Sequence, residues 1–213
     1  MGSHYARGAE PSADQIRRTL AEVVDTLRSA RVDFLLMGGL SAATLARRRP
    51  TDDIDVFVRP DGAGPAIEAL AGAGFDTEET DPQWIYKAVK HGVLVDVIFR
   101  STGGLQLDDE MLRRGSEREH LGVVAPRVSP EDLVVIKAVA AAEHSPSHWY
   151  DALAVVARCE LDWEYLVRRG RQAGPHRLLS LLLYAESDGV AVPPRVIDDL
   201  LAAVHPEPQR GVP

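Results

Sequence analysis

The chain has 213 residues, a formal net charge of −8 and a hydrophobic content of 45%. The acidic balance argues against a broad nucleic-acid-binding face, because phosphate contacts require clustered lysine and arginine. The one cysteine, Cys159, excludes an internal disulfide and a cysteine-based metal site. No apolar run reaches the length of a membrane span, and the N-terminus lacks the apolar stretch of a signal peptide, so we expect a soluble, cytoplasmic protein with no membrane partner.

The first half of the chain alternates helical and strand patterns. Ser12 and Gln15 have the spacing of a capping box, which predicts a helix from there to about Ala30. A strand, a short helix and a second strand are predicted in "DFLLMGG", "LSAATLARR" and "DIDVFV", and a third helix follows in "DGAGPAIEALAGAGF". The segment "WIYKAVKHGVLVDVIF" predicts two strands around a tight turn at His91-Gly92, and "EREHLGVVAPRV" predicts another hairpin.

The character of the sequence changes at Ser129, which caps a helix that begins with proline and two acidic residues. From there to about residue 204 the pattern is helical throughout. The predicted helices span residues 130–143, 148–158, 162–172, 175–187 and 194–204. We therefore expect an α+β fold with two domains: an α/β domain over residues 1–128 and a helical domain over residues 129–213.

Two aspartates stand at the start of the strand "DIDVFV". In a strand, Asp53 and Asp55 project to one face, while the alternate residues project toward the core. Two carboxylates this close raise each other's pKa unless a cation lies between them. Mg²⁺ is the natural cation, since it takes oxygen ligands and usually brings phosphate with it. An aspartate at the start of a strand is also often only a turn residue, and we assign that role to Asp52.

A third aspartate, Asp96, lies inside the apolar segment "VLVDVIF". A charged carboxylate in such a segment costs several kcal/mol unless it meets a metal, a hydrogen-bond network or solvent. If its strand pairs beside residues 53–58, the three aspartates form one cluster that can hold two metal ions. The preceding strand carries Lys87, which we interpret as a surface cross-strand charge.

The segment "LLMGGLSAATL" reads as a strand, two glycines and the start of a helix. Gly38 and Gly39 would let a phosphate approach the backbone, where the first N–H groups of the helix bind it, and Ser41 would add a hydroxyl. A tight strand-to-helix turn explains the same residues equally well. Both alternatives stay open on this segment alone.

Taken together, these motifs resemble the polymerase-beta-type nucleotidyltransferase superfamily, in particular its small bacterial members, which include antibiotic and toxin-like nucleotidyltransferases. The resemblance covers roughly residues 18–160. It rests on the glycine pair, the Asp-x-Asp motif after a short helix and the later strand aspartate: Gly38, Gly39, Asp53, Asp55 and Asp96. The segment "SPEDLVVIKAVAAAEHSPSHWYDALAVV" also looks like the helical region of these members, with Lys137 and Asp151 at the matching positions, although "HWYD" lacks the basic residues that often precede that aspartate.

The resemblance implies a nucleotidyltransferase-type mixed sheet with flanking helices, followed by a helical region. It implies transfer of a nucleoside monophosphate from an NTP such as ATP to an acceptor hydroxyl, with release of pyrophosphate. Asp53, Asp55 and Asp96 would hold two Mg²⁺ ions, and Asp96 would also take the acceptor's proton. The triphosphate would contact Gly38, Gly39, Ser41, Arg49, Thr51 and Lys137. Lys137 also has the spacing of a core-facing residue whose amine reaches solvent.

Three functional hypotheses follow. The first is an active nucleotidyltransferase, for which the acidic charge mildly favours a small-molecule or protein acceptor over tRNA; a toxin-type enzyme acting on tRNA or protein is the alternative. The second is a non-catalytic nucleotide-binding module with the same fold, which the presence of all three carboxylates disfavours. The third is a helical partner-binding protein with structural aspartates, which the buried setting of Asp96 disfavours. The sequence predicts neither the base nor the oligomeric state.

Overall fold

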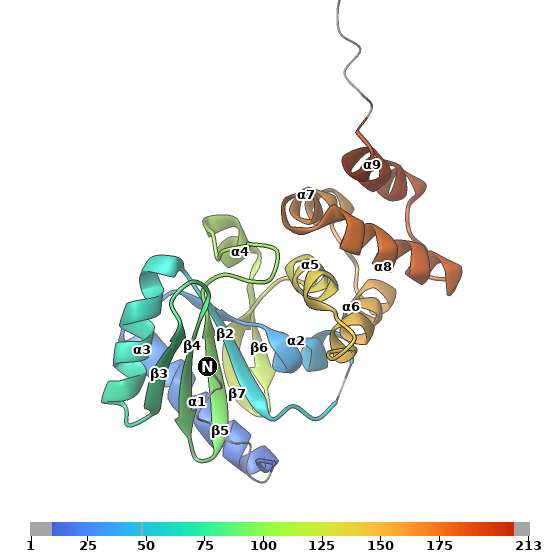
Figure 1. Ribbon diagram of the computed structural model, residues 1–213. Coiled ribbons are helices and arrows are strands. Elements are labelled where there is room, and N and C mark those ends of the chain that lie inside the picture. Colours follow the sequence, from blue (N-terminus) through green and yellow to red (C-terminus); the bar gives the residue numbers. More distant parts are fainter. Residues whose placement is uncertain (1–9, 48, 207–213) are drawn as a thin grey trace, which may run out of the picture. The chain divides into compact units, whose positions relative to one another are not determined.

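A computed structural model describes residues 10–47 and 49–206 of the chain (Figure 1). Contacts between residues divide it into two compact units, Met1–Ser129 and Pro130–Pro213. The division falls close to the expected boundary after residue 128. Within the described ranges, no helix combines the length and the apolar character that crossing a membrane would require.

The first unit is built on a mixed sheet, and the described residues contribute seven strands to it in the order β3-β4-β5-β2-β1-β7-β6. The pairs β2·β5 and β1·β7 are parallel, and the other neighbours are antiparallel. The strands are β1 (Phe34–Leu36), β2 (Asp53–Val58), β3 (Asp76–Asp81), β4 (Ile85–Lys90), β5 (Val93–Ile98), β6 (Ser116–His120) and β7 (Val123–Arg127). The α+β prediction with a mixed sheet is confirmed.

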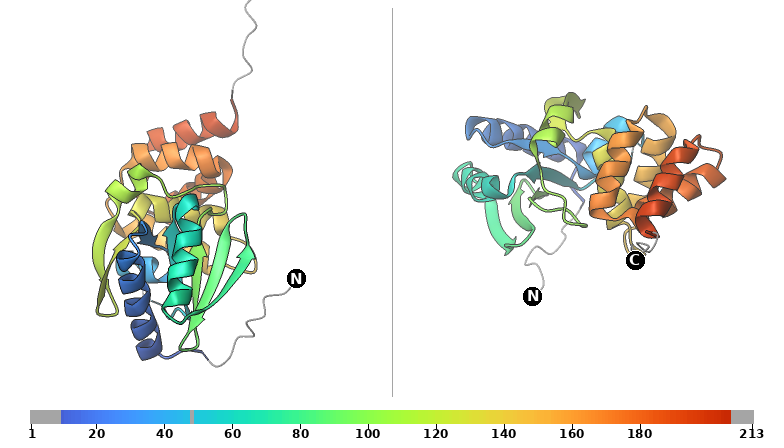
Figure 2. Two further views of the ribbon diagram at one scale, coloured as in Figure 1. Left: turned by 90° about the vertical axis from the view of Figure 1, so that its left-hand side faces the viewer. Right: turned by 90° about the horizontal axis from the view of Figure 1, so that it is seen from above.

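Helices α1 (Ala13–Ser29) and α3 (Ala63–Gly72) lie side by side on one face of this sheet (Figure 2). Their apolar side chains and those of the strands form one buried cluster, which includes Leu20, Ile54 and Val95. The remaining helical segments of the unit are α2 (Gly38–Leu45), the 3₁₀ turn η1 (Pro60–Gly62) and α4 (Asp109–Arg114). Because side chains alternate along a strand, the aspartates of β2 and β5 project to the face opposite this cluster.

Two local sequence patterns in the first unit, the helix capping box and the hairpin turn, are confirmed. The capping box at Ser12 and Gln15 forms, and α1 ends within one residue of the predicted position. His91 and Gly92 both have positive φ, the conformation that a two-residue hairpin turn requires. Strand β3 is missing from the prediction, because its sequence "DTEETD" has two β-branched threonines but no apolar residue and therefore no apolar alternation that would mark a strand.

The second unit is helical throughout its described residues, as predicted, and the helix bounds differ from the predicted ones by at most three residues. Its helices are α5 (Pro130–Ala140), α6 (Ser147–Arg158), α7 (Trp163–Ala173), α8 (Pro175–Ser187) and α9 (Pro194–Val204). Helix α5 is buried on almost every side, since three consecutive residues, Leu133, Val134 and Val135, are each 0% exposed.

Glu22 on α1 forms ion pairs with two residues of the β4–β5 hairpin. Its carboxylate accepts hydrogen bonds from Lys90 at 2.6 Å and His91 at 3.0 Å, which lower the pKa of Glu22 from 4.5 to about 2. Because the folded-state pKa lies below the unfolded one, the stabilisation from this carboxylate is present above about pH 4.5 and is lost as the pH falls toward 2.

We therefore expect Glu22→Gln to lower the melting temperature at neutral pH, and the gap to the wild type to close as the pH drops from 5 toward 2.5. Thermal melts across this range measure the effect. Glu68→Gln is the matched control, since Glu68 is exposed and has no ion pair among the described residues. A gap that stays constant with pH would contradict the role of Glu22.

Candidate active site

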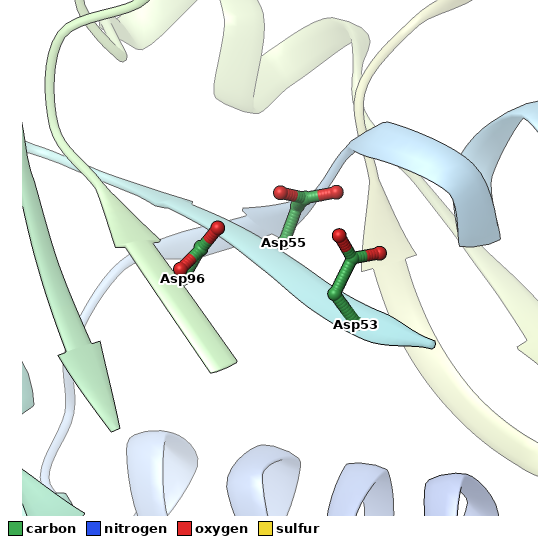
Figure 3. A group of neighbouring side chains, drawn as sticks. All are labelled: Asp53, Asp55 and Asp96. Carbon is green, nitrogen blue, oxygen red and sulfur yellow. The ribbon is translucent and has the colours of Figure 1, made fainter. Parts of the chain in front are cut away.

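Three aspartates meet on the face of the sheet that α1 and α3 leave uncovered. Strands β2 and β5 pair in parallel with Asp55 directly opposite Asp96. Asp53, Asp55 and Asp96 each offer a carboxylate oxygen, and these oxygens lie within 4.8 Å of one another. Figure 3 shows the three side chains pointing from the two strands toward a common space. The expected pairing of the Asp96 strand with residues 53–58 is therefore present.

Lys87 lies directly opposite Asp96 on β4. Its amine donates to the Asp96 carboxylate at 2.6 Å, and the two side chains are only 17% and 15% exposed. The interpretation of Lys87 as a surface charge is therefore wrong, because the hairpin register places it inside the acidic cluster. Burial raises the pKa of Asp96, whereas the Lys87 ammonium lowers it and so favours the ionised carboxylate.

Thr51 holds Asp53 in place. The Thr51 hydroxyl donates to the Asp53 carboxylate at 2.7 Å across two positions of the chain. Sequence reasoning assigned Thr51 to the triphosphate and missed this bond. In an extended segment, residues two positions apart project to the same side, so the spacing of Thr51 and Asp53 was the available signal.

The two glycines permit a close approach between the start of α2 and the aspartate strand. A Cβ at Gly38 would lie 1.6 Å from Oδ2 of Asp55, and Gly38 has a φ of +64°. A Cβ at Gly39 would lie 2.5 Å from the Thr51 hydroxyl oxygen and 3.4 Å from an Arg49 guanidinium nitrogen. Both glycines lie within the first turn of α2. Arg49, Thr51 and Asp55 therefore lie next to the N-terminus of this helix.

Gly38→Ala is expected to abolish whatever chemistry the cluster performs, because the new methyl group would occupy the position of the Asp55 carboxylate. The left-handed backbone adds about 1–2 kcal/mol of strain for a residue with a Cβ. Enzymatic activity and the melting temperature should therefore both fall. Activity assays together with thermal melts measure the two effects.

Gly72→Ala provides the control, since a Cβ there meets nothing within 4 Å. This change should leave activity unaltered and hold or raise the melting temperature, because alanine restricts the unfolded chain. A Gly38→Ala variant as active as Gly72→Ala would show that the position of the Asp55 carboxylate is immaterial.

Ser41 does not fit its predicted role as a phosphate ligand. The side chain is fully buried, and its hydroxyl donates to the Leu36 carbonyl at 2.8 Å. The hydroxyl thus ties α2 back to β1, a contact that favours the strand-to-helix-turn interpretation for this residue. Arg49, by contrast, is only partly buried and lies beside Gly39. Its neighbour Arg48 lies outside the described residues.

Lys137 is buried in the second unit. It is 2% exposed, and its amine donates to Asp151 at 3.1 Å and lies 3.2 Å from Nδ1 of His148. Asp151 is completely buried. The lysine therefore has its counter-ion on the following helix, and the sequence match that picked out Lys137 and Asp151 corresponds to an ion pair between α5 and α6.

The sequence profile of a family described as uncharacterised nucleotidyltransferase matches residues 3–187 of the chain. That match spans most of the sequence, including the glycines and all three aspartates. The chain belongs to this nucleotidyltransferase family. It is an enzyme that transfers nucleotides, as the motifs implied. No curated protein matches its sequence.

Several solved structures resemble this nucleotidyltransferase at low sequence identity. An antigenic nucleotidyltransferase-like protein from Paracoccidioides brasiliensis is 15% identical, with a TM-score of 0.53, and the match covers 91% of this chain and 95% of that one. The antibiotic-resistance factor ANT(2'')-Ia is 15% identical, with a TM-score of 0.49 and coverage of 83% and 92%. The lincosamide antibiotic adenylyltransferase LnuA is 14% identical, with a TM-score of 0.47 and coverage of 68% and 97%. The likeness concerns the fold.

Proposed function

We propose that this nucleotidyltransferase moves a nucleoside monophosphate from an NTP to an acceptor hydroxyl in a Mg²⁺-dependent reaction that releases pyrophosphate. The observation that carries the proposal is the meeting of Asp53, Asp55 and Asp96 within 4.8 Å in a member of a nucleotidyltransferase family. Three carboxylates in one partly buried place repel each other, and a divalent cation relieves that repulsion.

The residues present fit Mg²⁺. All three donors are carboxylate oxygens, which a hard cation prefers, and each side chain keeps part of its surface exposed to a ligand. Bound at such a site, magnesium ions would supply charge stabilisation and alignment for in-line phosphoryl transfer, and we propose the two-ion arrangement. Asp53 and Asp55 would hold both ions, and Asp96 would hold one.

Asp96 is also the group we propose to accept the proton of the acceptor hydroxyl. A general base must be ionised before the reaction. Lys87 favours the ionised form of Asp96 in the metal-free site, and a bound cation would favour it once the nucleotide is present. Thr51 keeps the Asp53 carboxylate in one orientation. These contacts preserve the geometry of the cluster between turnovers.

The triphosphate is proposed to bind at the N-terminus of α2. The first N–H groups of a helix have no intrahelical partner and carry partial positive charge, which suits a phosphate. Gly38 and Gly39 form this end of the helix, and Arg49 lies beside it. We propose that their backbone and the Arg49 guanidinium contact the β- and γ-phosphates, with unit 1 carrying the chemistry.

A small molecule is the acceptor class we favour, because the net charge of −8 disfavours a long polyanion such as tRNA. A toxin-type enzyme that modifies tRNA or protein is the second candidate, and a binding module without turnover is the third. ATP is the first donor to test. The need for NTP agrees with the cytoplasmic location expected from the sequence.

Thermal melts with each of the four NTPs, with and without Mg²⁺, test this function. A ligand that binds only the folded state raises the midpoint by mass action. We expect one NTP to raise it in the presence of Mg²⁺, and the Asp55→Ala variant to lose that response. Release of pyrophosphate in an acceptor screen then separates an enzyme from a binding module. The absence of any shift with all four NTPs would contradict the proposed site.

A further inference from the structure

Four charged residues form one row across four neighbouring strands. The register of β3·β4 places Glu78 opposite Lys87, that of β4·β5 places Lys87 opposite Asp96, and that of β2·β5 places Asp96 opposite Asp55. Residues directly opposite each other project to the same face of a sheet. The lysine therefore stands between two carboxylates on the face that carries the aspartate cluster.

Lys87 is bound to only one of these two carboxylates. Its amine contacts Asp96 at 2.6 Å. Glu78 has no ion-pair partner within the described part of the chain, although its side chain is partly buried and its Cα faces that of Lys87 across the strand pair. A lysine side chain is long and rotatable, so one amine can reach either of two directly opposite neighbours.

The charge at the cluster changes when a cation enters it. Without a metal, the Lys87 ammonium offsets part of the charge of the three carboxylates. With a divalent cation bound among Asp53, Asp55 and Asp96, the same ammonium becomes a repelling neighbour, because like charges a few ångströms apart in a partly buried place interact strongly.

We propose that Lys87 is an exchange cation: it neutralises Asp96 in the metal-free enzyme and moves to Glu78 when metal-nucleotide enters the site. Lys87 is then a positioning residue that keeps the empty cluster folded and sets how readily the cluster takes up its metal. The inference rests on the proposed metal site and adds Lys87 and Glu78 to it.

Two measurements on the full chain test the exchange. The electron paramagnetic resonance signal of free Mn²⁺ reports how much Mn²⁺ the protein binds, and thermal melts in EDTA report the stability of the metal-free protein. Lys87→Met removes the ammonium but retains the length of the side chain. In EDTA its melting temperature should fall, because Asp96 loses its counter-ion. Its affinity for Mn²⁺ should rise by about tenfold, because the competing charge is gone.

Two further variants complete the test. Lys87→Arg keeps the charge and should bind Mn²⁺ as the wild type does. Glu78→Gln removes the second carboxylate, so the displaced lysine has no partner; the EDTA melt should match the wild type while Mn²⁺ affinity falls several-fold. If Lys87→Met does not fold without metal, the Glu78→Gln comparison alone decides.

The Mn²⁺ measurements distinguish a failure of the proposed exchange from a failure of the proposed metal site. Weaker or unchanged Mn²⁺ binding by Lys87→Met, or Mn²⁺ binding by Glu78→Gln equal to that of the wild type, would overturn the exchange while the metal site stands. Equal Mn²⁺ binding by the wild type and Asp55→Ala, or none by either, would overturn the metal site and the exchange with it.

Discussion

Replacing Asp96 with asparagine is expected to reduce nucleotidyl transfer by at least about a thousandfold. The change removes the proposed proton acceptor, which typically contributes about 10²–10⁴-fold, and weakens one oxygen ligand of the cluster as well. Pyrophosphate release, measured over a range of NTP and Mg²⁺ concentrations, gives kcat and KM for the variant and the wild type. The loss should appear mainly in kcat if proton transfer is the role of Asp96.

Asp61→Asn makes the same chemical change at an exposed position of η1 and should behave as the wild type does. The variant of Asp96 should retain a melting temperature shift with NTP, because Asp53 and Asp55 remain. Turnover by Asp96→Asn close to that of the control would remove Asp96 from the reaction and leave its burial beside Lys87 as a structural feature.

Lys137→Met is expected to destabilise the second unit by about 3–5 kcal/mol, because it removes the ammonium that pairs with the fully buried Asp151 carboxylate. Chemical unfolding followed by the circular dichroism of the helices measures the loss. The double variant Lys137→Met with Asp151→Leu should recover most of it, since replacing both members of a buried pair by apolar groups is often nearly neutral.

This comparison also separates the two roles considered for Lys137. A phosphate contact predicts a raised KM for the NTP in both the single and the double variant. A purely structural pair predicts that the double variant has both normal stability and normal KM. A single variant as stable as the wild type would show that the ion pair with Asp151 contributes nothing.

Much of unit 1 follows from local rules that the sequence displays. The capping box set the start of α1, and alternation in "DIDVFV" placed Asp53 and Asp55 on one face. The two-residue turn at His91-Gly92 pairs Lys90 with Val93, which already implies that Lys87 faces Asp96. The position of Lys87 beside Asp96 is therefore encoded locally, because counting outward from the turn gives the register.

By itself the sequence determined the aspartates, their faces, the glycine pair and the family, because these depend on residue type and short-range spacing. Only the tertiary structure decided that β2 pairs in parallel with β5, which brings Asp55 beside Asp96 across 41 positions of the chain (96 − 55). It likewise decided that Ser41 and Lys137 are buried and bonded within the protein. Parallel pairing and burial depend on contacts between distant segments, whose register and solvent exclusion no local pattern encodes.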